Sequence, residues 1–231
     1  MLMKSTANSL INLKNFKIFV QFVLTRAAVA YAVVFLMSHV IIDYDKIKFG
    51  LGLRQLNFMM PNSYQELLEV ENLHQQAKIE RFQKYIDFYA KVVELLPQKA
   101  EAYGMLGFCY YYLGDVKSAL QAFEEAHRVN PKFFWFSYNL GAIYFNLKDY
   151  PKAQEYFKQA VGNDINLSYS YILNSREIYM PILKTFEKPE KEAESRLIQA
   201  YYFCQEQIKL LDLKINSKPA KLPAQLVVRI F

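Results

Sequence analysis

Between residues 100 and 166, apolar and polar positions follow a helical pattern, and the whole pattern occurs twice at an offset of 34 residues. Each copy predicts two helices of about a dozen residues, joined by a short turn that contains an aspartate. We therefore expect one antiparallel helix pair at 100–133 and a second at 134–167. The identities that repeat at this offset are Leu106 and Leu140, Gly107 and Gly141, Tyr110 and Tyr144, Leu113 and Leu147, Asp115 and Asp149, Ala119 and Ala153, Phe123 and Phe157, and Ala126 and Ala160.

The smallest of the repeated residues predict where the two helices of each pair cross. Antiparallel helices approach closely only where a side chain is small. We therefore expect Gly107 and Gly141 on the first helices, and Ala119 and Ala153 on the second, to be the repeat-packing positions. The aspartate in each turn is expected to cap the helix that follows it.

Six of the repeated pairs fall on the pattern L-G-x2-Y…A-x3-F-x2-A, which resembles the tetratricopeptide repeat (TPR) family. The resemblance implies an all-α, TPR-like α-solenoid of antiparallel helix pairs that serves as a scaffold for a partner protein. In that family, fixed positions of each repeat line a concave groove. The partner-binding groove residues that the resemblance implies are Phe108, Tyr111, Tyr112, Trp135, Tyr138, Phe145 and Asn146, with Glu101, Gly104 and Ala142 completing the lining.

Six of these ten lining residues are aromatic, and none is Lys or Arg. Chaperone-binding members of the family use Lys, Arg and Asn there to clamp a terminal carboxylate, so the composition disfavours that partner. Aromatic side chains favour an apolar or aromatic-rich peptide or helix as the partner. The alternative is that flanking helices or the apolar tail at 226–231 fill the groove, so that the aromatic residues are core.

The segments on either side of the two repeats predict a TPR-like helical domain over 63–213. Ser63 and Glu66 match a capping box, which predicts a helix from Tyr64 toward Ile79 or Phe82. With a second helix over 83–96, the stretch 63–99 is interpreted as a degenerate first repeat. C-terminal helices are expected at 167–213: one over 167–184, broken or kinked at Pro181, and one over 190–213. The tail, 214–231, is expected to be docked or frayed.

The N-terminal third predicts a membrane anchor. A basic segment, 1–17, precedes 25 residues at 18–42 that are mostly apolar and would form about 37 Å of helix, enough to span a bilayer. Arg26 opposes insertion and is expected to reach toward the headgroups, or alternatively to pair with an acid on another membrane helix. A connector, 43–62, follows the span.

These features predict a single-pass membrane protein, with the N-terminus cytoplasmic and the TPR domain on the opposite side of the membrane. We interpret it as a membrane-anchored scaffold or adaptor. The alternative is a structural subunit of a larger membrane complex, whose transmembrane helix packs through Arg26.

Charge and composition exclude other classes. Residues 1–60 carry seven Lys and Arg against two Asp and Glu, a net charge of +5, whereas the remainder carries 21 against 20, a net charge of +1. A nucleic-acid-binding domain would be basic, so we expect no nucleic-acid partner. His39, His74 and His127 are isolated from one another, and no nucleophile, phosphate-loop or zinc spacing occurs. We expect no enzyme activity, no cofactor and no metal.

Overall fold

The computed structural model describes residues 17, 20–31, 51, 52, 55, 64–70, 75–175 and 178–230. The chain divides into two compact units, Met1–Arg54 and Gln55–Phe231, which are treated separately here.

Residues 20–31 of the first unit form a helix whose side chains are exposed. Across the described part of the chain, no helix combines the length and the apolar character that a membrane span requires. Much of the predicted span at 18–42 lies outside the described residues, as do most of the basic segment 1–17 and of the connector 43–62.

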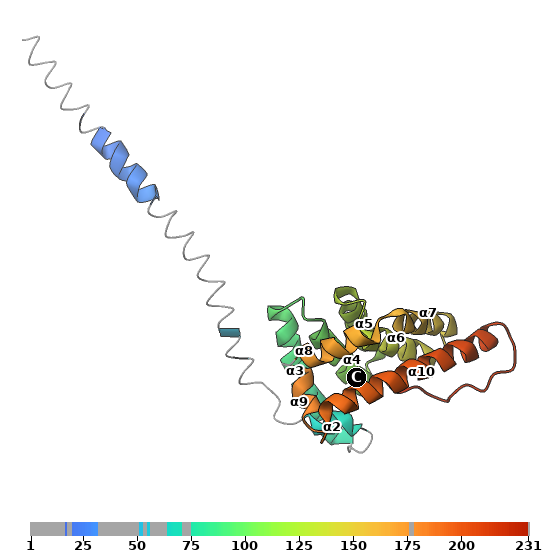
Figure 1. Ribbon diagram of the computed structural model, residues 1–231. Coiled ribbons are helices and arrows are strands. Elements are labelled where there is room, and N and C mark those ends of the chain that lie inside the picture. The colour runs from blue at the N-terminus through green and yellow to red at the C-terminus, as the bar shows by residue number, and fades with distance from the viewer. Residues whose placement is uncertain are drawn as a thin grey trace, which may run out of the picture. The chain divides into compact units, whose positions relative to one another are not determined.

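The centre of the second unit consists of two antiparallel helix pairs. The first pair is α4 (Ala100–Tyr112) and α5 (Val116–Val129), and the second is α6 (Phe134–Asn146) and α7 (Tyr150–Gly162). Each pair packs internally, and α5 packs against α6, so the pairs stack as a solenoid (Figure 1). The expected all-α, TPR-like fold is therefore confirmed.

The turn inside each pair is built as the sequence predicts. The Oδ1 atom of Asp115 accepts the backbone N–H three residues later at 3.0 Å, and Asp149 does the same at 3.3 Å, so each caps the second helix of its pair. Gly114 has a φ of 87°, and Lys148, the equivalent residue of the second pair, has a φ of 64°. This left-handed conformation ends the first helix in both pairs. It has no steric cost for Gly114, which lacks a Cβ atom, but it does for Lys148.

Close approach of the paired helices depends on the two repeated glycines. A Cβ atom added to Gly107 would lie 2.6 Å from the ring of Phe123, and one added to Gly141 would lie 2.7 Å from the ring of Phe157. The aromatic ring of the second helix therefore rests directly on the backbone of the first.

The two alanines expected at the crossings are also enclosed. Ala119 on α5 and Ala153 on α7 are fully buried. Any larger side chain at these positions would have to displace the facing helix.

The stretch before the repeats differs from the expected helix pair. It contains the short helix α2 (Gln65–Leu68) and one continuous helix, α3 (Gln75–Leu95), which packs on α4. The expected break after Phe82 was wrong. Apolar residues keep their helical spacing through this point, and Phe82, Tyr85, Ile86, Tyr89 and Val92 are all buried. Ser63, the predicted cap, lies outside the described residues.

After the repeats come α8 (Ile165–Asn174), α9 (Tyr179–Leu183) and α10 (Pro189–Ile215). The predicted break is present but lies at Ser175, since Pro181 falls inside α9, where a first-turn N–H needs no intrahelical partner. The long final helix is confirmed and packs along α7. Its backbone at Ile208 accepts a hydrogen bond of 3.2 Å from the side chain of Gln154.

The glycine contacts give a first prediction. Gly107→Ala should cost about 1–3 kcal/mol of unfolding free energy, because the new methyl group overlaps the Phe123 ring. Each kcal/mol corresponds to a fall in Tm of about 2–4 °C, measurable by calorimetry. Gly162→Ala is the matched control, since nothing lies within 4 Å of a Cβ at that position. Equal melting temperatures for the two variants would contradict the proposed packing.

Candidate protein-binding groove

The chain turns after α10 and runs back over the repeats without regular secondary structure (Figure 1). We call residues 225–230 the tail segment. Leu226, Val228 and Ile230 are buried, with exposed fractions of 3%, 1% and 8%, whereas Val227 is 44% exposed. This alternation is the side-chain period of an extended chain with one face against a surface.

That surface, hereafter the inner groove, lies on the first helix of each repeat. Its floor and walls come from side chains that contact the tail segment or the cavity beside it. They are Phe108, Tyr111 and Tyr112 of α4 and Tyr138, Asn139 and Asn146 of α6.

Two asparagines of α6 bind the backbone of the tail segment. Each one hydrogen-bonds to both the N–H and the carbonyl of a single tail residue. Asn146 accepts the N–H of Leu226 and donates to its carbonyl, both at 2.7 Å. Asn139 accepts the N–H of Arg229 at 2.8 Å and donates to its carbonyl at 2.6 Å. Seven helical residues rise about 10.5 Å, and three extended residues span about 10 Å, so the two spacings match.

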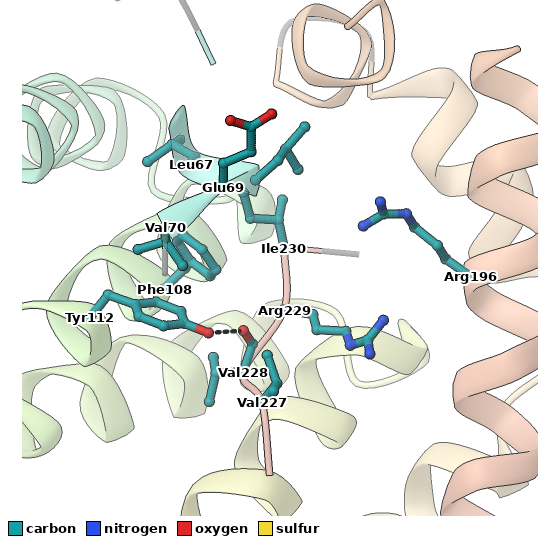
Figure 2. Close-up of a pocket in the computed structure, with 11 residues that line it drawn as sticks. Leu67, Glu69, Val70, Phe108, Tyr112, Arg196, Val227, Val228, Arg229 and Ile230 are labelled. Atoms are coloured by element: carbon teal, nitrogen blue, oxygen red, sulfur yellow. Dashed lines mark hydrogen bonds between the residues drawn. The ribbon is translucent and has the colours of Figure 1, made fainter. Parts of the chain in front are cut away.

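Two tyrosines hold the carbonyls that lie between these contacts. The Tyr138 hydroxyl donates to the carbonyl of Val227 at 3.2 Å, and the Tyr112 hydroxyl donates to that of Val228 at 2.9 Å (Figure 2). Burial raises the pKa of Tyr138 to about 12, which keeps its hydroxyl protonated and able to donate at neutral pH. The four consecutive carbonyls of residues 226–229 thus all accept hydrogen bonds from groove side chains.

An aromatic cluster fixes the position of Tyr112. Its ring lies 4.8 Å from that of Phe108 and 6.3 Å from that of Phe82 on α3, measured between centroids. These rings hold the hydroxyl in place without help from the tail segment.

A cavity of about 260 Å³ adjoins this cluster and the buried side chains of the tail segment (Figure 2). One side of the cavity is lined by Leu67 of α2 and by Val70, which follows that helix, and another side is lined by Arg196 of α10. The cavity leaves room next to Val228 and Ile230 for side chains larger than theirs.

Several residues predicted for the groove do contact the tail segment. Tyr112, Tyr138 and Asn146 bind its backbone, the hydroxyl of Tyr111 accepts a hydrogen bond from Gln225 at 3.3 Å, and Phe108 lines the adjoining cavity.

Two predicted groove residues belong instead to the interior. Trp135 is fully buried, and its ring packs 5.2 Å from those of both Phe134 and Tyr138. Phe145 is 3% exposed and packs 5.7 Å from the ring of Tyr150. Both side chains pack between helices in this structure, and their role in partner binding stays a prediction.

Asn139 was missed. Only Ser137, Asn139 and Asn146 are polar in α6, whose other ten residues are apolar, aromatic or glycine. A buried amide requires hydrogen-bond partners, so a polar residue seven positions before Asn146 was the available signal.

The far end of the groove is filled by the flanking helices. Glu101 is 4% exposed and accepts a hydrogen bond of 2.6 Å from the hydroxyl of Ser175, at the point where α8 ends. Tyr179 and Ile182 of α9 are buried there. Gly104 faces the next repeat, since its Cβ would lie 2.6 Å from the ring of Phe136. Tail and flanking helices therefore divide the groove between them.

Among the described residues, no group of three or more His, Cys, Asp or Glu side chains is placed to hold a metal ion. Cys109 and Cys204 are both free and buried. Burial raises the pKa of both thiols, which leaves them protonated and poorly nucleophilic.

With this geometry in hand, the repeats can be assigned to a class. Residues 100–133 and 136–164 each match a family model described as the tetratricopeptide repeat. The chain therefore contains two tetratricopeptide repeats, and these matches indicate no catalytic family.

The similarity to relatives covers part of this chain. The chain is 29% identical to Hsp70-Hsp90 organizing protein 1 of Glycine max over 49% of its own length and 20% of that protein. It is 27% identical to the general transcriptional corepressor trfA of Dictyostelium discoideum over 45% of its length and 8% of that protein. It is 33% identical to the uncharacterized protein ycf37 of Pyropia yezoensis over 29% of its own length and 38% of that protein. The chain thus covers well under half of each relative.

The asparagine contacts give a second prediction. Asn139→Ala removes two backbone hydrogen bonds, worth about 1–3 kcal/mol together, and should release the tail segment as a unit. The amide of Leu226, which Asn146 binds, should then exchange about 5–150 times faster in residue-resolved hydrogen–deuterium exchange. Asn163→Ala, which removes a hydrogen bond to the Pro131 carbonyl instead of one to the tail segment, should leave this rate unchanged. Faster exchange at Arg229 alone would contradict docking as a unit.

Proposed function

We propose that this protein is a TPR scaffold that binds a partner protein through the inner groove and is anchored in a membrane by residues 18–42. One observation carries the first part: groove side chains accept or donate hydrogen bonds along an extended chain at four consecutive carbonyls and two amides. Hydrogen-bonding groups arranged in this way fit the backbone of a peptide.

The chemistry of the groove defines what it would bind. Bonds to the backbone select an extended conformation, as in peptide recognition by strand addition. The rings of Phe108, Tyr112 and Tyr138 offer apolar surface for the inward side chains. The partner in this proposal is therefore an apolar or aromatic-rich segment. No cofactor or nucleic acid is part of it.

The membrane anchor rests on the sequence of residues 18–42. The apolar run is long enough to span. Three basic residues precede it and three follow it before residue 60, and Arg26, nearer the N-terminal end, favours a cytoplasmic N-terminus, with the TPR domain on the other side. In the described helix the guanidinium of Arg26 lies 4.2 Å from the centre of the Phe22 ring, one turn earlier. This direction, back toward the N-terminus, suits a side chain that reaches for the headgroups.

The second candidate function is that of a fixed subunit in a larger membrane complex. Arg26 favours it, because a cation within an apolar run is retained where an acidic partner helix compensates for its cost. In that case the solenoid would act as a brace.

Membrane extraction tests the anchor. The full chain should remain in the membrane pellet after alkaline carbonate treatment, whereas a chain that starts at residue 43 should appear in the supernatant, because the apolar run is absent. Immunoblotting of both fractions measures the distribution. Release of the full chain would contradict the anchor.

Affinity purification from detergent extracts tests the groove. The Asn139→Ala/Asn146→Ala chain should lose a partner that the wild type retains, because the backbone bonds that would hold that partner are gone. The matched control is Asn163→Ala/Asn216→Ala, whose side chains hydrogen-bond to the backbone of Pro131 and Asp212 and not to the tail segment. Circular dichroism should show equal helicity for both. Identical partners in both variants would contradict the groove.

The same assay separates the two candidate functions. Arg26→Leu should leave the partner of an adaptor bound, since the groove is untouched. Loss of assembly with Arg26→Leu, and not with the asparagine variant, would establish the subunit.

A further inference from the structure

The tail segment occupies the inner groove in the manner of a ligand. Its backbone provides the hydrogen bonds, and its side chains point alternately toward and away from the groove, with Leu226, Val228 and Ile230 inward and Val227 outward. The side-chain hydrogen bond from Gln225 to Tyr111 is long, at 3.3 Å, and exposed. Most of what holds the segment would therefore be available to another chain with the same alternation.

The groove itself is formed by side chains that other helices support. Tyr112 packs against Phe82 of α3, and Tyr138 lies 6.2 Å from the ring of Phe157 on α7 and 6.5 Å from that of Phe203 on α10. None of these three contacts involves the tail segment. We therefore expect the hydroxyl groups to keep their positions when the segment leaves.

The connection to α10 allows exchange. Residues 216–225 are exposed or half-buried and have no regular secondary structure. The segment can therefore leave the groove without unwinding a helix. A linker of this length holds the segment at an effective concentration of roughly millimolar, which an incoming partner must overcome.

From these observations we infer that residues 225–230 are an intramolecular ligand that closes the groove. The partner that opens it is an extended segment with aliphatic side chains at three alternate positions. Val227, between the first two of those positions, faces outward, so the side chain at its position is not selected. This inference rests on the proposed function, since it specifies both the partner of that groove and its control.

A pair of neighbouring valines allows a matched test in the full chain. Val228→Asp places a charge against the groove and should release the tail segment, whereas Val227→Asp places the same charge at a 44% exposed position. A fluorescent peptide with the sequence of residues 224–231 is titrated into detergent-solubilised wild type and both variants. Fluorescence anisotropy gives the affinity.

The peptide should bind Val228→Asp at least tenfold more tightly than it binds wild type or Val227→Asp, because the inner groove is open only in the Val228→Asp variant. Peptides that carry the same two substitutions should behave in parallel: the one with aspartate at 228 loses binding, and the one with aspartate at 227 keeps it. Equal affinities for the three chains, with unchanged circular dichroism, would overturn closure by the tail segment while leaving the groove as a binding site.

Failure of the proposed function gives a different result. If the folded Val228→Asp chain does not bind the peptide at all, the groove does not hold extended segments of this kind and both ideas fall. Adding Asn139→Ala to Val228→Asp should abolish binding, and retained binding would place the peptide outside the groove.

A measurement on the unmodified chain covers the case in which Val228→Asp does not fold. Excess free peptide should accelerate deuterium uptake at the amides of Leu226 and Arg229 at least severalfold, while amides within α6 stay unchanged. Uptake that does not respond to the peptide would overturn the inference. Light scattering completes the test: a wild-type mass of two chains that falls to one with Val228→Asp would show that a second copy fills the groove, and would overturn the intramolecular assignment.

Discussion

The need to satisfy buried backbone polar groups governs the functional face of this protein. An extended chain laid on aromatic rings loses water from its amides and carbonyls, and each group left unpaired costs about 1–3 kcal/mol. Asn139 and Asn146 meet this requirement by hydrogen bonding to Arg229 and Leu226. Their separation of two helical turns matches three extended residues, so the register of the bound chain is set by the geometry of α6.

The fold of the repeats could be predicted because its determinants are local and occur twice. Gly107 and Gly141 mark helix crossings through their size alone, and Asp115 and Asp149 cap the helix next to them in sequence. Such features need no knowledge of distant segments. The second turn shows the limit of exact repetition, since Lys148 adopts the left-handed conformation that Gly114 adopts without strain.

What could not be predicted depends on contacts between segments far apart in sequence. The helix at 165–174 ends at Ser175, which hydrogen bonds to Glu101, 74 residues earlier. Aromatic residues at groove positions cannot be divided into core and lining by residue type, because Trp135 and Tyr138 are both buried aromatic residues and yet Tyr138 bonds to the tail segment. Whether the groove is open or filled depends on a tail that bonds to residues 80 to 116 positions away. From residue type alone, the aromatic residues at the groove positions could therefore be interpreted either as the lining of an open groove or as core.

A groove that recognises backbone selects the shape of its ligand more than its sequence. Four carbonyls and two amides are bound whatever side chains they carry, so discrimination is left to the three inward positions now held by Leu226, Val228 and Ile230. Such a groove, left open, would expose apolar rings and unpaired donors to any extended chain, as an exposed strand edge does. An occupant from the same chain reduces that exposure. As the intramolecular ligand inferred above, it would also set a threshold that weak ligands do not pass, so that the specificity of the groove would come from this competition as much as from its own side chains.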